Sequence, residues 1–149
     1  MYEPWMEEAL VLAKQAGDKG EVPIGAVVIM NDQIIGRGYN RPISQDDPTA
    51  HAEIEALRDA AQHMGNYRLP GSSLVVTVEP CTMCAGALVH ARVQNLIFGT
   101  RAPRAGAVKS TATVLDKTTL NHRVSVTEGI LADECGALLR SFFQSRRDR

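Results

Sequence analysis

Residues 74–99 read LVVTVEPCTMCAGALVHARVQNLIFG, and this stretch decides the architecture of the chain. Its first part, Leu74–Val78, is a continuous run rich in β-branched residues, which is typical of a strand buried on both faces. Pro80 suits the first turn of a helix, which we expect from about Cys81 to Ala91, and Leu96–Gly99 is a second apolar run. Two strands joined by a helix favour a parallel pair, so helices must cover the sheet.

The segments on both sides of this unit carry the periodicities and turn residues of further helices and strands. The expected elements are a helix over Trp5–Ala16, strands over Ile24–Met30 and Gln33–Gly38 with a turn at Asn31-Asp32, a helix that starts within Asp47-Pro48-Thr49 and ends near Met64, a short helical stretch near Thr111–Leu115, a strand over Val124–Val126 and a last helix over Leu131–Arg146. This order predicts a three-layer α/β fold, with a mixed five-stranded sheet and helices on both faces.

The length of 149 residues, with 44% hydrophobic and 22% charged residues, is typical of one globular domain spanning residues 1–149. A chain of this size buries roughly 70% of its unfolded surface, so its core needs no disulfide or metal, and a bound metal is free to be functional. The longest apolar run, 24–30, is far shorter than the ~20 residues of a membrane helix. The N-terminus lacks a secretory signal pattern, and an odd number of cysteines favours a reducing compartment, so we expect a cytoplasmic protein.

The formal net charge of −1 hides an uneven distribution along the chain. Residues 1–91 carry six basic and twelve acidic side chains, whereas residues 92–149 carry ten basic and five acidic ones. The basic half includes the loop Arg101–Lys109 and the tail Arg140–Arg149. This polarity could present a basic face to a polyanion, and a chance distribution over a mixed surface gives the same numbers.

Two short motifs, HAE at 51–53 and PCTMC at 80–84, each open a predicted helix. Cys81 and Cys84 are three residues apart, so both sulfurs leave the same face of the first helical turn, where the partial positive charge stabilises thiolates. His51 can supply a third ligand. Two cysteines and one histidine leave one position open, which is a catalytic rather than a structural zinc arrangement. Cys135 belongs to an apolar stripe of the last helix, and we expect it to pack in the core.

Glu53 lies two residues after His51, and both side chains can approach a site beyond the N-terminal end of their helix. A carboxylate beside a metal-bound water, without being a ligand, is placed to take the proton of that water. The Cys-x-x-Cys spacing alone is also compatible with a structural zinc half-site or a redox motif. The nearby HAE motif favours the catalytic interpretation.

The two motifs together resemble the signature of the zinc-dependent cytidine and adenosine deaminases. Further blocks extend the resemblance to the bacterial tRNA adenosine deaminase family over nearly the whole chain. These blocks are EVPIGAV at 21–27, NRP at 40–42, DPTAHAE at 47–53, EPC at 79–81, NHRV at 121–124 and TEGILADEC at 127–135. The zinc signature identifies only the superfamily, and the last two blocks narrow it to the enzymes that act on tRNA.

The resemblance implies a cytidine-deaminase-like fold and hydrolytic deamination of the wobble adenosine in a tRNA anticodon loop to inosine. One zinc ion per subunit would be held by His51, Cys81 and Cys84. A zinc-bound hydroxide would attack the purine, and Glu53 would shuttle the proton. The family is homodimeric, so a homodimer without membrane attachment is expected.

The resemblance also implies substrate-binding residues. Asn40 matches a residue that hydrogen-bonds the target base, and Arg146 and Arg147 match basic positions that meet the RNA. Ala102 is a departure, because the family commonly has an acidic residue there. The absence of that acidic residue puts the backbone contact to the target nucleotide in doubt.

Two other functions stay open at this point. One is deamination of a free base or nucleoside by the same zinc chemistry, against which stand the basic second half and the block at 121–135. The other is a non-catalytic zinc-binding RNA module, which leaves the position of Glu53 beside a three-ligand site unexplained.

Overall fold

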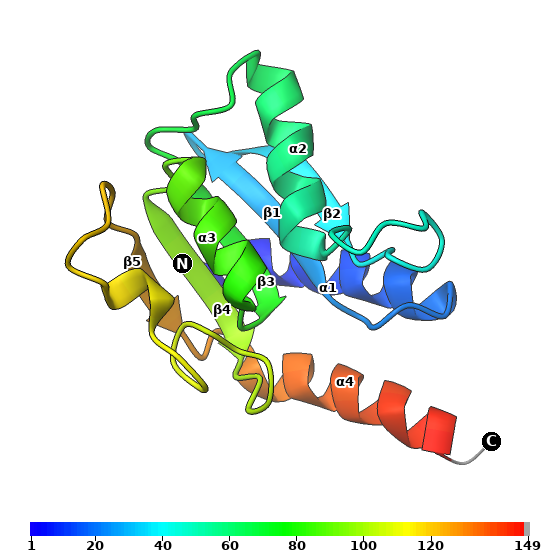
Figure 1. Cartoon of the computed structure of the whole chain (residues 1–149). Helices are drawn as coiled ribbons and strands as arrows, with labels where there is room; N and C mark the ends of the chain where they lie inside the picture. The colour runs from blue at the N-terminus through cyan, green and yellow to red at the C-terminus, as the bar shows by residue number, and fades with distance from the viewer. Residues whose placement is uncertain (148–149) are drawn as a thin grey trace.

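Within residues 1–147, which the computed structural model describes, five strands form one mixed sheet with helices on both faces (Figure 1). Residues 148 and 149, the end of the basic tail Arg140–Arg149, lie outside the described part of the chain. The helices are α1 (Glu3–Asp18), α2 (Ala52–Met64), α3 (Thr82–His90) and α4 (Ala132–Arg147), with a short 3-10 helix η1 (Val114–Asp116). The strands are β1 (Gly25–Met30), β2 (Gln33–Tyr39), β3 (Ser73–Val78), β4 (Asn95–Thr100) and β5 (Ser125–Glu128).

The sheet has the order β2-β1-β3-β4-β5. β1 runs antiparallel to both of its neighbours, whereas β4 runs parallel to β3 and to β5. The strand–helix–strand unit that residues 74–99 predict is therefore present as β3, α3 and β4. The expected three-layer α/β fold with a mixed five-stranded sheet is confirmed.

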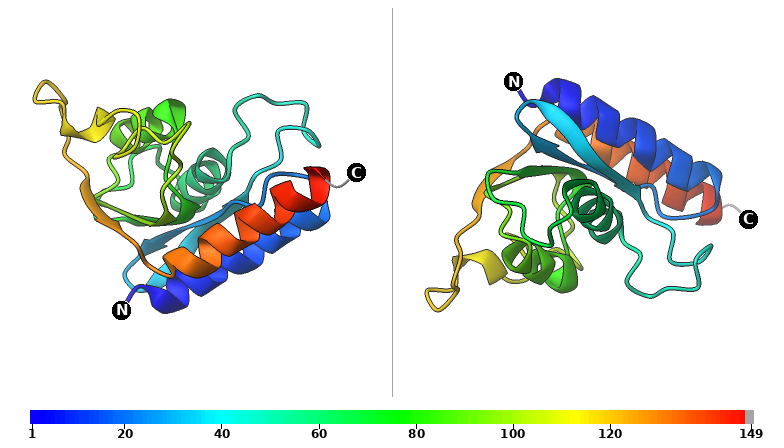
Figure 2. Two further views of the ribbon diagram at one scale, coloured as in Figure 1. Left: turned by 90° about the horizontal axis from the view of Figure 1, so that it is seen from below. Right: turned by 90° about the horizontal axis from the view of Figure 1, so that it is seen from above.

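Each face of the sheet is covered by two helices (Figure 2). Alternate residues of a strand point to opposite faces. Leu74, Val76 and Phe98 accordingly pack in the core under α2 and α3. Val75 and Ile97 pack in the second core under α1 and α4. Because β3 and β4 are buried on both faces, their sequences read as continuous apolar runs.

The hairpin turn between β1 and β2 is the one that the sequence predicts. Asn31 and Asp32 have φ values of 53° and 60°, a pair of left-handed residues that forms a type I′ turn. Short polar side chains tolerate this conformation better than other non-glycine residues do. The turn fixes the antiparallel register that brings the end of β2 back beside α2.

The start of α2 lies later than the sequence analysis expects, at Ala52 instead of within 47–49. Asp47 uses Oδ1 to accept hydrogen bonds from the N–H and the hydroxyl of Thr49, which closes a local turn and not the first turn of a helix. Asn40 at the end of β2 supplies the cap instead, because its Oδ1 accepts the N–H of Ala52 at 2.7 Å. Because this capping residue belongs to another part of the chain, the residues at the start of α2 carry no sequence pattern that marks where the helix begins.

Two glycines let β2 and α2 approach each other closely. A Cβ atom at Gly36 or at Gly38 would collide with the backbone of α2, at the carbonyl oxygens of Ala56 and Ala52 respectively. This close packing fixes the N-terminal end of α2, and with it the residue before the helix, His51. Among residues 1–147, no helix combines the length and the apolar character needed to span a membrane.

Candidate functional site

The N-terminal ends of α2 and α3 meet at the carboxyl end of β3 (Figure 1). His51 is the N-cap residue of α2, and Cys81 is the N-cap residue of α3. Both residues have extended backbones, so their side chains lie before the first turn of their helices. Cys84 follows within the first turn of α3 and is buried. Two helix N-termini thus direct their partial positive charges toward one small volume.

Three ligand atoms gather in this volume. His51 Nδ1 lies 3.6 Å from Cys81 Sγ and 3.6 Å from Cys84 Sγ. The three atoms all lie within 4.8 Å of one another, close enough to hold one metal ion. Zinc bonds of about 2.3 Å to sulfur and about 2.05 Å to nitrogen, at a tetrahedral angle, separate the two ligand atoms by about 3.6 Å. The donor set and its spacing therefore fit a zinc ion.

The titratable groups of this cluster share their protons. Hydrogen bonds from Cys84 and from His51 lower the pKa of Cys81 to about 3, against the effect of burial. The hydrogen bond that Cys84 donates to Cys81, together with burial, raises the pKa of the Cys84 thiol. The hydrogen bond with Cys81 also raises the pKa of His51. The hydrogen bonds within the cluster thus favour a proton on Cys84 and on His51 and disfavour one on Cys81. A metal ion that binds both sulfurs must displace the proton of Cys84.

Glu53 points into the same region from the first turn of α2, and it is only 4% exposed. Burial raises the pKa of its carboxyl group to about 7, and the negative charge of Cys81 acts in the same direction. A backbone hydrogen bond and the charge of His51 act to lower the pKa. A carboxyl group whose pKa lies near neutrality can both accept and donate a proton, as an acid–base catalyst must.

Cys135 takes no part in this cluster. It is 1% exposed in the core beneath α1 and α4, on the other face of the sheet from α2 and α3. Burial raises the pKa of its thiol to about 12, so it stays a neutral, apolar group. The expectation that Cys135 packs in the core is confirmed, and within residues 1–147 the cluster holds three metal-ligand candidates and not four.

Comparison of the chain with known proteins identifies its family. Residues 2–147 match the MafB19-like deaminase family. The chain is 50% identical to the tRNA-specific adenosine deaminase of Haemophilus influenzae over 147 residues, which cover 98% of this chain and 85% of the relative. The chain belongs to the tRNA-specific adenosine deaminase family. It is also 42% identical to the enzyme of that name from Bacillus subtilis, over 99% of this chain and 91% of the relative.

Solved structures agree with this assignment. The deaminase superposes with a TM-score of 0.88 on a structure from a study of A-to-I editing by tRNA:A34 deaminases, at 44% identity over 90% of this chain and 97% of that chain. A guanine deaminase from Nitrosomonas europaea superposes with a TM-score of 0.82, at 27% identity over 95% of this chain and 84% of that chain. The cytidine-deaminase-like fold that the resemblance implies is therefore confirmed.

Asn40, which the resemblance implies as a substrate-binding residue, lies directly beside the metal-ligand cluster of the deaminase. Its side chain is 7% exposed, and its Oδ1 is held by the N–H of Ala52, the residue next to His51. The remaining polar group of Asn40 is its amide NH2, which is a hydrogen-bond donor. The residue thus has a structural role, as the cap of α2, that the sequence did not reveal.

Arg146 and Arg147 do not join this cluster. They are exposed in the last turn of α4, on the opposite face of the sheet from α2 and α3. Arg146 donates a hydrogen bond from Nη2 to the carbonyl of Gly20 at 2.9 Å, and its guanidinium carbon lies 4.3 Å from the centre of the Phe142 ring. Arg146 thereby links the end of α4 to the segment after α1.

Two buried glutamates, Glu21 and Glu79, have hydrogen-bonding roles that the sequence analysis did not assign, although both belong to the blocks quoted there. Glu21 accepts hydrogen bonds from the N–H groups of Ile43 and Ser44, in the segment between β2 and α2. Glu79, which directly follows β3, is 4% exposed and accepts hydrogen bonds from N–H groups of the 102–110 segment. Burial acts to raise the pKa of Glu79, but the hydrogen bonds outweigh it and lower the pKa to about 2. The sequence does contain one signal for the role of Glu79, because an acidic residue stands there directly after an apolar strand.

Proposed function

We propose that this protein hydrolytically deaminates the wobble adenosine of tRNA to inosine and ammonia, with one zinc ion per subunit held by His51, Cys81 and Cys84. One observation carries the proposal. Three ligand atoms with the spacing of a single tetrahedral ion lie beside a buried carboxyl group whose pKa is near 7. The tRNA-specific relatives at 40–50% identity support tRNA as the substrate.

The side chain of Glu53 handles the protons of the reaction. When bound, zinc supplies the positive charge that makes a water molecule acidic enough to react near neutral pH. Glu53 takes one proton of the attacking water and transfers it to the purine ring. It then carries the second proton, from the new hydroxyl group on the purine carbon to the amino group, which leaves as ammonia while the oxygen stays as the carbonyl of inosine. Burial raises the pKa of Glu53, so its carboxyl group holds a proton more readily than an exposed carboxyl group does, as a group that accepts and then donates protons requires.

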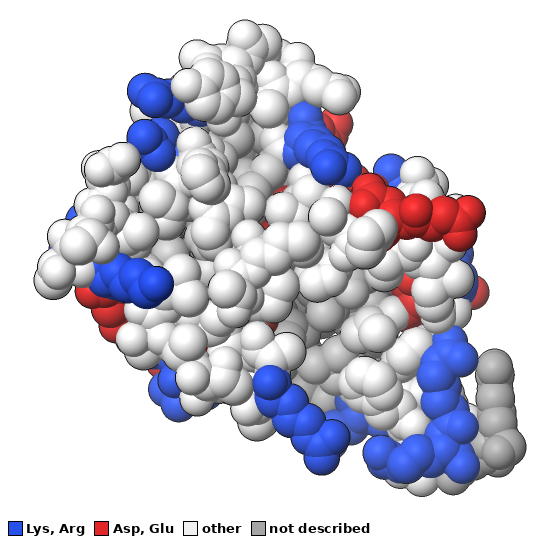
Figure 3. Space-filling model, viewed as in Figure 1, with Lys and Arg blue, Asp and Glu red and all other residues white. Residues whose placement is uncertain are grey.

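Substrate binding would use a polar amide beside the metal and basic side chains farther away. The NH2 group of Asn40 would donate a hydrogen bond to the target base. Arg146 and Arg147 would approach the RNA backbone from α4. Figure 3 shows Lys and Arg side chains along the lower edge of one face. They lie over the segment that follows β4, which includes the 102–110 loop, and over the C-terminal part of α4. Such contacts to phosphates supply affinity that depends on salt.

The homodimer is also part of this proposal. An apolar surface between α2 and α3, which includes Ile54, Leu57 and Ala87, would be the surface that a second copy covers. Tyr67 borders this surface and is 69% exposed, which is typical of an aromatic anchor in an interface. Light scattering of the purified protein would measure the mass in solution. None of the three cysteines forms a disulfide, which suits the reducing conditions of the cytoplasm, the proposed location.

A second candidate is deamination of a free purine, which the structural similarity to a guanine deaminase favours. One experiment separates the two. The zinc-loaded protein is incubated with an anticodon stem-loop that carries a wobble adenosine, and separately with free adenosine, guanine and cytosine. Mass spectrometry then detects inosine in the stem-loop or the deaminated free base. Conversion of guanine without conversion of the stem-loop would refute the proposal and favour the second candidate.

A further inference from the structure

The carboxylate of Glu79 is the centre around which the 102–110 segment folds. Its Oε2 accepts the N–H groups of Val108, Lys109 and Ser110 at 3.0, 2.7 and 2.9 Å. Its Oε1 accepts the N–H of Ala102 at 3.0 Å and the hydroxyl of Ser110. A single buried side chain therefore satisfies four backbone N–H groups from both ends of one loop. Without this acceptor, the N–H groups would be buried without partners or the loop would move into water.

The loop is shaped to receive this carboxylate. A Cβ atom added at Gly106 would collide with all three atoms of the Glu79 carboxyl group. The φ angle of Gly106 lies outside the left-handed region, so the close approach, and not the backbone conformation, requires glycine here. The N–H of Ala107 also donates to the carbonyl of Pro80 at 2.9 Å. Hydrogen bonds and steric fit thus fix the loop against the residues that lead into α3.

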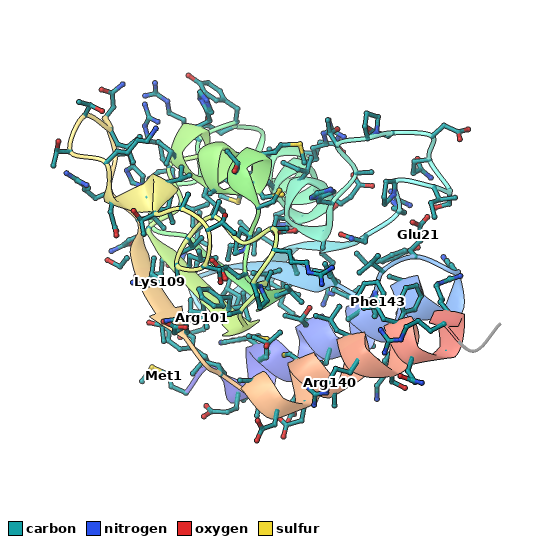
Figure 4. The ribbon with its side chains drawn as sticks, turned by 60° about the horizontal axis from the view of Figure 1, so that its bottom comes forward. Met1, Glu21, Arg101, Lys109, Arg140 and Phe143 are labelled. Atoms are coloured by element: carbon teal, nitrogen blue, oxygen red, sulfur yellow. The ribbon has the colours of Figure 1, made fainter. Side chains whose placement is uncertain are left out.

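The loop lies next to the metal-ligand cluster because Glu79 lies two residues before Cys81. The N–H of Glu79 donates to the carbonyl of Thr100 at 2.9 Å, so the ends of β3 and β4 are joined at this point. The carboxyl ends of parallel strands are where ligands bind in α/β sheets. Figure 4 labels Arg101, which directly precedes the loop, and Lys109, which lies on it. Arg104 and Lys109 are exposed.

We infer that Glu79 is a positioning residue for the RNA substrate: its carboxylate holds the 102–110 loop as a preformed wall of the substrate site beside the zinc ligands. Glu79 does not touch the reacting atoms. It acts through the backbone at Ala102 and through the exposed cations Arg104 and Lys109. The inference rests on the proposed function. Because a preformed loop lowers the entropic cost of binding, its loss weakens binding more than it slows the chemical step.

The substitution Glu79→Gln would test this inference with a small change in shape. The amide oxygen can replace Oε2 and keep the three N–H donors at 108–110. The amide NH2 then replaces Oε1 and faces the N–H of Ala102, and two donors cannot bind each other. The Ser110 hydroxyl can rotate and accept a hydrogen bond from the NH2 group. The substitution therefore releases the loop at Ala102 and leaves the rest of the anchor in place.

The experiment compares zinc-loaded wild-type protein with Glu79→Gln on the anticodon stem-loop. We expect KM to rise by about tenfold, which corresponds to one unsatisfied hydrogen bond, while kcat stays within about twofold. The zinc content should be unchanged. Hydrogen exchange should be faster at the Ala102 amide in the variant. Gly106→Ala, which disturbs the same contact from the side of the loop, should raise KM in the same way.

A matched control is Asp59→Asn, because the Asp59 carboxylate also accepts one backbone N–H, that of Arg37, at a distant edge of the sheet. This control should leave KM unchanged. If Glu79→Gln lowers kcat or the zinc content and leaves KM unchanged, Glu79 acts on the metal site and the inference is wrong. Unchanged exchange at Ala102 would also overturn it. If the wild-type protein does not deaminate the stem-loop, the proposed function is wrong, while exchange at Ala102 still reports on the anchor itself.

Discussion

The ionised carboxylate of Glu79 should make a large contribution to folding stability that disappears in acid. The hydrogen bonds of the 102–110 segment lower the pKa of Glu79 from its ordinary value of 4.5 to about 2. A pKa that is lower in the folded state means that folding favours the ionised form. The stabilisation is therefore fully present above about pH 4.5 and is lost as the pH falls toward 2.

The size of this contribution follows from the pKa difference. A difference of about 2.5 pKa units corresponds to about 3 kcal/mol of unfolding free energy at neutral pH. At pH 3 the same linkage leaves about 1 kcal/mol. Small domains have total stabilities of about 5–15 kcal/mol, so the loss is easily measured.

The assay is urea unfolding of the wild-type protein and of Glu79→Gln at several pH values from 7 to 3, with the same metal content for both. The other acid-sensitive groups, including the metal ligands, are common to both proteins, so they cancel in the difference. We expect Glu79→Gln to destabilise the protein by about 3 kcal/mol at pH 7 and by about 1 kcal/mol at pH 3. A difference that stays constant over this range would show that the charge of Glu79 does not provide the stabilisation.

Further predictions concern the site and its supports. Glu53→Gln should lower kcat by about 10²–10⁴ with zinc retained, and an active variant would contradict the role of Glu53 in proton transfer. Removal of zinc with a chelator should abolish deamination and lower the melting temperature, and added zinc should restore both, as measured by activity and calorimetry. Asn40→Ala should cost about 1 kcal/mol because it removes the cap at Ala52, whereas Asn40→Asp, which keeps the oxygen, should unfold at nearly the wild-type urea concentration. Gly36→Ala should cost about 1–3 kcal/mol in the same assay, since its Cβ would collide with α2, and an unchanged stability would show that α2 can move.

Local patterns were enough to predict most of the elements. The apolar run at 74–78 became β3, and the pair Asn31-Asp32 became the turn between β1 and β2. Gly65 ends α2 with a φ angle of 66°, as a left-handed cap does. These predictions succeed because strand periodicity, turn conformation and helix termination depend on residues that are close in sequence.

The start of α2 could not be predicted in the same way. Asp47 and Thr49 have the composition of a helix cap, but they bond to each other, and the cap comes from Asn40. That bond joins residues 12 positions apart, so it requires the end of β2 and the start of α2 to be packed against each other. A tertiary contact therefore decided a boundary that local composition placed several residues too early.

The sequence by itself determined the chemistry of the site. Cys81 and Cys84 were identifiable as a pair because a spacing of three residues places two sulfurs on one face of a helix turn. The substrate contacts of Asn40, Arg146 and Arg147 came from family resemblance, whereas the acid–base role of Glu53 was inferred from its position beside His51, and all of these roles stay predictions. The tertiary structure decided which groups meet: His51 is 30 residues from Cys81 along the chain and 3.6 Å away in space.

The same distinction holds for the environment of the site. Desolvation raises the pKa of Glu53 and hydrogen bonds lower that of Glu79, although both residues are glutamates in the same sequence. Burial and hydrogen bonding are properties of the packed chain, because they depend on neighbours that come from other elements. The sequence supplied the candidate ligands and the candidate acid–base group, and the packing of two helix ends on one sheet edge determined their distances and shifted their pKa values.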